Sequence, residues 1–179
     1  HGFSHKSSGK AGLVFDADLD GKPLLSDSSW KAVTHPAYEN TGEPHPNFRL
    51  PESNVRFDAQ RDMAGWQNPD FDDSTWPTTT EQGKPPCSPW NQLVERPIPL
   101  WKDFGLKDYE NAAELPTVSD GKVIKATLPY NAQVTPYLKI EGPAGQLIDL
   151  RMDNYSGGKA PNVRAEYVTR EGIQEYESL

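Results

Sequence analysis

The chain has 179 residues, 25% of them charged, and a formal net charge of −8. This acidic balance argues against a nucleic-acid partner, because phosphate recognition needs clustered Lys and Arg. The single cysteine, Cys87, excludes an internal disulfide, and no apolar run approaches the roughly 20 residues that a membrane-spanning helix needs.

The composition predicts many short strands separated by turns. The hydrophobic fraction is low, at 35%, whereas Pro (17) and Gly (14) are frequent. A Pro-rich disordered chain is the alternative, but five Trp, seven Tyr and six Phe favour packed cores. The chain begins at His1 without an initiator Met or a signal peptide, so we expect a processed or excised piece.

Alternation of apolar and polar residues is the main local signal, and helical periodicity is nearly absent. The first alternating segment is Leu13–Leu19, and Asp20-Gly21 after it predicts a hairpin turn. Gly142-Pro143 and Glu171-Gly172 predict two later turns. We expect an all-β fold, an antiparallel β-sandwich or jelly roll. The further predicted strands are 124–128, 138–140, 148–152 and 163–167.

The composition changes near position 105, which predicts two consecutive sandwich units. All five Trp and most of the Pro precede this point, and regular alternating segments follow it. We therefore predict a first unit over 1–104, a connector over 105–111 and a second unit over 112–179. Residues 34–51 form a long irregular stretch, and loops of that length are often functional.

Two acidic motifs have competing interpretations. Asp16-x-Asp18-x-Asp20-Gly21 resembles part of an EF-hand calcium loop. Such a loop needs flanking helices, whereas the residues before it alternate like a strand, so a hairpin is favoured. Asp72-Asp73 could be a catalytic pair, but neighbours on a strand face opposite sides. We favour a cap of a short turn that directs Trp76 inward.

The tryptophans are either core residues or platforms on which a sugar ring stacks. Trp76 and Trp90 are the candidate platforms, and Trp90 lies in a Pro-rich stretch typical of a loop. Glu52, Ser53 and Asn54 offer oxygen ligands for Ca²⁺ or partners for sugar hydroxyls, although an ordinary polar loop is the alternative. The four histidines lack partners at metal-binding spacing, so they are interpreted as surface residues. Cys87 is interpreted as chemically inert.

Several segments together resemble the accessory β-sandwich region of bacterial α-L-rhamnosidases of the inverting glycoside hydrolase type. The resemblance covers nearly the whole chain, and the order and spacing of the segments carry it. It implies that 1–104 is a galactose-binding-like, carbohydrate-binding-module-like sandwich. The matching segments are Gly12-Leu13-Val14-Phe15, Phe57-Asp58-Ala59-Gln60-Arg61, Gly65-Trp66, Phe71-Asp72-Asp73-Ser74-Thr75-Trp76, Leu93-Val94-Glu95-Arg96-Pro97-Ile98-Pro99, Gly142-Pro143-Ala144-Gly145 and Tyr167-Val168-Thr169-Arg170-Glu171-Gly172.

The resemblance implies a non-catalytic role in binding or positioning rhamnose-containing glycans. In that family one accessory module binds L-rhamnose with Ca²⁺, which would place a site at Glu52, Ser53 and Asn54, closed by Asn91 and the Pro97 carbonyl. The two catalytic carboxyls belong to an α/α-barrel, expected elsewhere in the same parent chain, so catalytic residues are expected to be absent here. The resemblance also favours a periplasmic or secreted bacterial protein. Two alternatives to this role are a structural scaffold that packs on the barrel and an autonomous glycosidase.

Overall fold

The computed structural model describes residues 12–41, 55–89, 92–100, 102–130, 132, 134–151 and 164–177. The chain divides into two compact units, each built from two stretches of sequence. The first unit is His1–Glu95 with Gly142–Gly172, and the second is Arg96–Glu141 with Ile173–Leu179.

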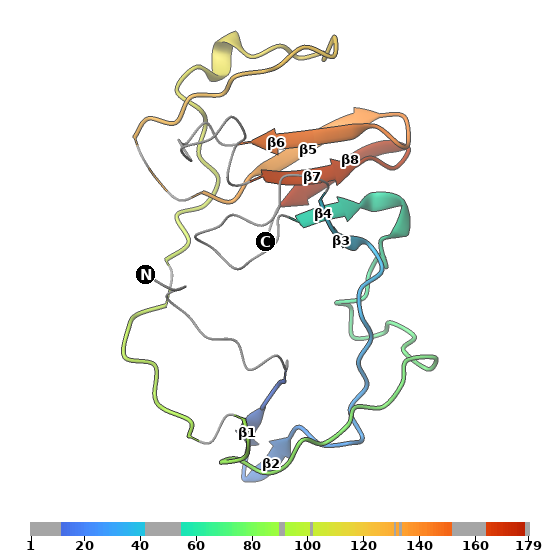
Figure 1. Ribbon diagram of the computed structural model, residues 1–179, viewed down its shortest axis with the longest axis vertical. Helices are drawn as coiled ribbons and strands as arrows, with labels where there is room; N and C mark the ends of the chain where they lie inside the picture. Colours follow the sequence, from blue (N-terminus) through green and yellow to red (C-terminus); the bar gives the residue numbers. More distant parts are fainter. Residues whose placement is uncertain are drawn as a thin grey trace. The chain divides into compact units, whose positions relative to one another are not determined.

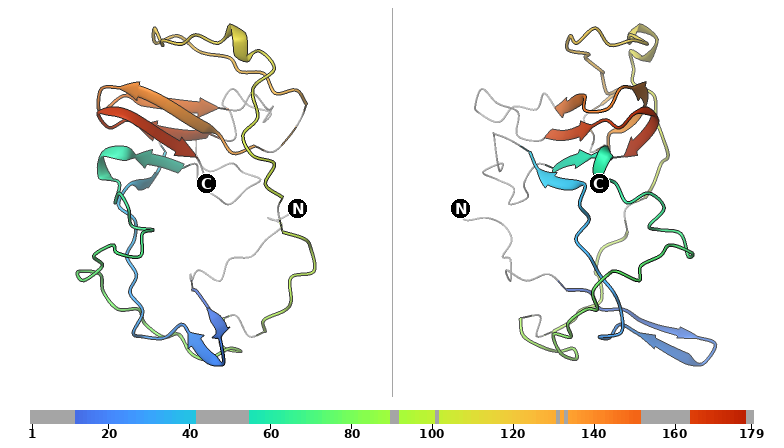
Figure 2. Two further views of the ribbon diagram at one scale, coloured as in Figure 1. Left: turned by 180° about the vertical axis from the view of Figure 1, so that it is seen from behind. Right: turned by 90° about the vertical axis from the view of Figure 1, so that its right-hand side faces the viewer.

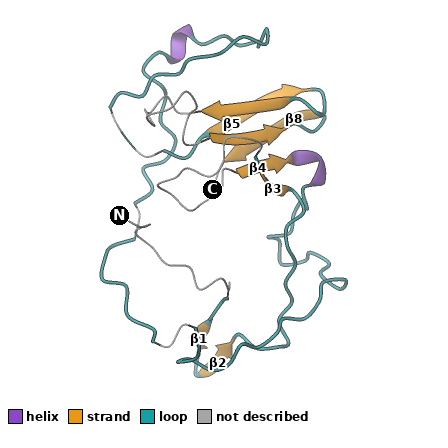
Figure 3. Ribbon diagram, in the orientation of Figure 1, coloured by secondary structure: helices purple, strands orange, loops and turns teal. Residues whose placement is uncertain are grey.

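The described residues are rich in strands and contain little helix (Figure 1, Figure 3). Eight strands and two short 3₁₀ helices are present in this part of the chain. This confirms the strand-rich class that the alternation predicts. The strands are β1 (Asp16–Leu19), β2 (Lys22–Leu25), β3 (Tyr38–Asn40), β4 (Val55–Asp58), β5 (Tyr137–Gly142), β6 (Leu147–Arg151), β7 (Arg164–Val168) and β8 (Gly172–Glu177), and the helices are η1 (Ala59–Arg61) and η2 (Ala112–Glu114).

Strands β1 and β2 form the hairpin predicted from the Asp20-Gly21 turn. Asp20 and Gly21 both have positive φ, at 54° and 79°, as a type I′ turn requires. Asp18 Oδ1 also accepts a hydrogen bond of 2.7 Å from the Gly21 N–H. This carboxylate therefore stabilises the turn, and the hairpin interpretation of the acidic motif is confirmed over the EF-hand alternative.

The first unit also contains a four-stranded sheet with the order β3-β4-β7-β6 (Figure 1). The outer pairs are antiparallel, but β4 and β7 run parallel, whereas the sequence predicted antiparallel neighbours. A tight turn forces neighbouring strands to be antiparallel, but a long connection imposes no such direction. Because β4 and β7 are far apart in the chain, local alternation could not reveal their orientation.

The cross-strand register of this sheet separates an apolar face from a charged face. Residues paired across neighbouring strands lie on the same face, and successive residues alternate between faces. Tyr167 lies at the centre of the apolar row and is 2% exposed, while Glu166 lies at the centre of the charged row and is 1% exposed. The apolar row is Tyr38, Phe57, Tyr167 and Ile148, and the charged row is Glu39, Arg56, Glu166 and Asp149.

Ion pairs neutralise the buried charge on the second face. The Arg56 Nε donates to Glu166 Oε2 over 2.6 Å, and an Arg164 terminal nitrogen contacts Glu166 Oε1. The Arg164 side chain is itself only 8% exposed. A buried charge is tolerated only when it is paired, so this arrangement allows Glu166 to occupy the centre of the sheet.

In the second unit, β5 pairs with β8, and the Lys139 ammonium lies 2.9 Å from Glu175. The strand predicted at 124–128 is wrong, because these residues form a loop. The Asn111 side chain there accepts from the Thr127 N–H and donates to the Lys125 carbonyl, both over 2.9 Å. A side chain thus replaces the neighbouring strand that the alternation implied.

The predicted division at 105–111 stays a prediction. The four-stranded sheet nevertheless takes strands from both sides of that position, since β3 and β4 precede it and β6 and β7 follow it (Figure 2). The first compact unit likewise joins residues 1–95 with residues 142–172. The boundary between units that composition predicts therefore differs from the division seen in the strand pairing and the compact units.

Candidate carbohydrate-contact site

Most of the residues predicted for the calcium and sugar site lie outside the described part of the chain. These are Glu52, Ser53, Asn54, Trp90 and Asn91. Pro97 is described and exposed, and it belongs to the second unit. The neighbouring Arg96 guanidinium donates to the carbonyls of Ile98 and Pro99, over 3.0 and 3.2 Å, which fixes the backbone that follows Pro97.

Trp76, a predicted platform, is half-buried at the end of a short turn. Asp72 Oδ1 accepts from the Ser74 N–H over 2.9 Å, and the Trp76 N–H donates to the Asp73 carbonyl over 2.9 Å. The Trp76 ring packs against Phe71 with centroids 5.6 Å apart. The capping interpretation of Asp72 is thus confirmed, and Trp76 has a packing partner on one side.

The contribution of the Asp72 cap to stability is expected to depend on pH. Hydrogen bonds from the Ser74 side chain, and then from its backbone N–H, hold the pKa of Asp72 below its ordinary value. A lowered folded pKa stabilises the fold above the unfolded pKa, about 3.9, and this contribution is lost as pH falls through the folded pKa. We expect Ser74→Ala to raise the Asp72 pKa in an NMR titration of the carboxyl carbon. An unchanged midpoint would contradict the assigned cause.

Four aromatic side chains, here called the aromatic group, form a cluster that the sequence analysis did not predict. They are His35, Tyr38, Phe57 and Trp66. His35 lies at its centre, with its ring centroid 5.2 Å from Tyr38, 6.0 Å from Phe57 and 6.3 Å from Trp66. Phe57 in turn stacks on Tyr167 with centroids 6.0 Å apart. The interpretation of His35 as a surface residue is wrong, because its side chain is only 15% exposed.

Two rings of the aromatic group are open to solvent. Tyr38 is 38% exposed and Trp66 is 45% exposed, while Phe57, which pairs with Tyr38 across β3 and β4, is half-buried. Monomeric proteins expose single apolar residues routinely, but Tyr and Trp, which carry a polar tip on an apolar ring, are enriched at binding surfaces. The aromatic group therefore exposes two such rings, and each contacts His35.

Local backbone geometry places Trp66 at this surface. The Trp66 N–H donates to the Met63 carbonyl over 3.2 Å, and the Asn68 N–H donates to the Gly65 carbonyl over 2.9 Å. Gly65 between them has φ +78°, and a Cβ there would meet Asn68 Nδ2 at 3.1 Å. Glycine is required at this turn because other residues avoid that conformation.

A polar pair accompanies the exposed rings. His35 Nε2 lies 3.4 Å from Asp62 Oδ1, and the Asp62 side chain is 28% exposed. His35 Nδ1 accepts from the Ala37 N–H over 3.2 Å. The aromatic group thus has a partly exposed carboxylate, that of Asp62, next to its central histidine.

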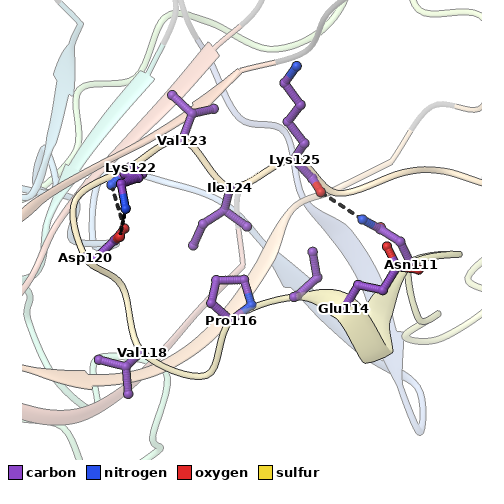
Figure 4. A pocket seen from close by; sticks show the side chains of 10 residues that line it. Asn111, Glu114, Pro116, Val118, Asp120, Lys122, Val123, Ile124 and Lys125 are labelled. Atoms are coloured by element: carbon purple, nitrogen blue, oxygen red, sulfur yellow. Dashed lines mark hydrogen bonds and ion pairs between the residues drawn. The ribbon is translucent and has the colours of Figure 1, made fainter.

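A shallow cavity of about 360 Å³ lies within the second unit, along the loop 110–127 (Figure 4). Pro116 and Ile124 contribute apolar walls, and Lys122 and Asp120 form an ion pair at its edge. Hydrogen bonds from the Lys122 side chain, and then from its backbone N–H, lower the pKa of Asp120. The cavity therefore offers apolar contact beside an already neutralised charge.

Asn111 is expected to hold this loop closed. Asn111→Ala removes the hydrogen bonds to Lys125 and Thr127, each contributing about 0.5–1.5 kcal/mol. We expect faster hydrogen exchange of the Thr127 amide, measured by NMR. Asn111→Asp is the control, because it keeps the acceptor for Thr127 and should retain much of the protection. Equal protection in Asn111→Ala and the unmodified protein would contradict this role.

The described residues contain no group of three or more His, Cys, Asp or Glu side chains that could hold a metal ion. Glu175 has a pKa lowered by Lys139, through a hydrogen bond and then charge. Asp27 has one lowered by hydrogen bonds from Ser29. Both carboxyls are thus stabilised in their charged form by hydrogen-bond donors.

No family model, curated protein or solved structure matches this chain. None of the helices among the described residues has the length and apolar character needed to cross a membrane.

Proposed function

We propose that this chain is a non-catalytic β-sandwich segment of an α-L-rhamnosidase-like glycoside hydrolase, and that it binds or positions rhamnose-containing glycans. The single observation that carries the proposal is the pair of exposed rings, Tyr38 and Trp66, in one aromatic group. The apolar C–H face of a pyranose packs on such rings. The strand-rich architecture agrees with the sandwich or jelly-roll arrangement that the proposal includes.

Calcium remains part of the proposal through the motif resemblance alone. Its ligands would be Glu52 and Asn54, with Asn91 and the Pro97 carbonyl, and Ser53 would contact sugar. Hard oxygen donors of this kind suit Ca²⁺. The catalytic barrel of the same parent chain would supply the hydrolytic carboxyls.

An isothermal titration with L-rhamnose, with and without Ca²⁺, tests the proposed function. We expect heat from binding, and no release of aryl alcohol from an aryl α-L-rhamnoside above the buffer rate. Turnover that disappears when one carboxylate of this chain is replaced would contradict the non-catalytic assignment. Loss of affinity both in EDTA and in Glu52→Ala would assign the binding to the predicted calcium loop.

A structural scaffold is the second candidate, and one observation favours it. Several apolar side chains of the described part of 92–106 are more than half exposed, and such residues are suited to packing on another domain. Titration with a separately expressed rhamnosidase barrel, followed by analytical ultracentrifugation, tests this candidate. The exposed residues are Leu93, Val94, Ile98, Leu100, Phe104 and Leu106.

A further inference from the structure

Within the aromatic group, His35 is the neighbour of two exposed rings and of one carboxylate. The His35 ring is nearly perpendicular to Tyr38 and to Trp66, with interplanar angles of 69° and 70°. Asp62 lies beside the imidazole, with its Oδ1 atom 3.4 Å from Nε2. A partly exposed carboxylate and two exposed rings therefore share His35 as a common neighbour.

We propose that Trp66, His35 and Asp62 form a binding site for a neutral pyranose that needs no metal ion. This proposal rests on the proposed function, because both require that the chain contacts sugar. It deepens that function in two ways. It places the contact on the aromatic group rather than on the loop Glu52–Asn54, and it names the groups that recognise the C–H face and the hydroxyls of the sugar.

The chemistry of a pyranose matches the two parts of this site. Its C–H face is apolar and suits the Trp66 indole, which offers a large and rigid contact area. Its hydroxyls can donate to Asp62, because a carboxylate has two oxygens and several acceptor positions. Hydrogen bonds to an ionised acceptor are roughly twice as strong as neutral ones, so no cation is needed to hold a pair of adjacent hydroxyls.

Contacts within the site limit the freedom of its polar groups. The Ala37 N–H donates to His35 Nδ1 over 3.2 Å, and His35 Nε2 lies 3.4 Å from Asp62 Oδ1. A binding group that is already oriented loses less conformational freedom on association. The carboxylate and the chain's net charge of −8 disfavour acidic sugars through like-charge repulsion. A neutral deoxy sugar such as L-rhamnose, whose methyl group adds apolar surface, fits these features.

The test uses the full chain with L-rhamnose as the probe, in buffer containing EDTA. We expect saturation-transfer NMR signals strongest on the sugar's C–H face and methyl group, and a shift of the Trp66 indole N–H resonance. Trp66→Ala should lower the affinity about tenfold, and Asp62→Asn should lower it several-fold. Tyr130→Ala is the matched control, because Tyr130 is an aromatic residue that is 72% exposed and has no role in either candidate function.

Circular dichroism and thermal unfolding establish that the variants fold, and Asp62→Asn, which preserves shape, tests the site if Trp66→Ala does not. Binding that vanishes in EDTA, or that survives both substitutions, overturns this proposal while the proposed function stands. Failure of the unmodified chain to bind L-rhamnose with or without Ca²⁺ overturns the proposed sugar binding as well and favours the scaffold.

Discussion

Replacement of Glu166 by alanine is expected to lower the free energy of unfolding by about 3–5 kcal/mol. The Glu166 side chain is 1% exposed and pairs with Arg56 and with Arg164, and the Arg164 side chain is 8% exposed. Removal of the carboxylate leaves the Arg164 guanidinium buried without its main counter-charge. Urea unfolding, followed by circular dichroism, measures the change.

The matched control for this prediction is Glu175→Ala. Glu175 also lies on a strand and pairs with a cation, Lys139, but the two side chains are 55% and 64% exposed. Exposed pairs contribute little to stability, because water screens them. If Glu166→Ala and Glu175→Ala shift the urea midpoint equally, burial of the ion pair is not what makes Glu166 important.

Tyr167→Ala is the second substitution with a large expected effect, a loss of about 3–5 kcal/mol. Tyr167 is 2% exposed, and its ring is parallel to that of Phe57 within 1°. The truncation leaves a cavity that the sheet cannot readily close. Because Phe57 also contacts His35, we expect the Trp66 indole resonance to move as well.

Tyr130→Ala is the control for this cavity, since Tyr130 is 72% exposed. A surface substitution of this kind usually changes stability by less than about 0.5 kcal/mol. Thermal unfolding of the two variants side by side gives the comparison. A Tyr167→Ala protein that unfolds at the same temperature as Tyr130→Ala would show that this row is not the core of the sheet.

Turns and caps could be predicted from the sequence, because the residues that form them are close together in the chain. Asp20-Gly21 specifies its own turn, because both positions require positive φ and the flanking residues alternate. Asp72 caps its turn through a bond to a residue two positions away. The strand predicted over 124–128 was wrong because an extended loop can show the same alternation of apolar and polar residues as a strand. Here Asn111 holds that loop.

The aromatic group could not be predicted, because it depends on contacts between distant residues. His35, Phe57 and Trp66 come from three separate stretches of chain, and no spacing links them. The parallel pairing of β4 with β7 has the same origin. Strand existence follows from alternation within a few residues, whereas partner and direction follow from tertiary packing, which no short window of sequence contains.

The link between β4 and β7 also has a consequence for biosynthesis. Arg56 and Glu166 are 110 positions apart, so β4 leaves the ribosome well before its neighbour β7 is synthesised. During that interval the β4 edge presents unpaired N–H and C=O groups, which other chains can pair with. Contacts between such distant residues also slow folding. Expression at low temperature or with chaperones should therefore raise the yield of soluble protein.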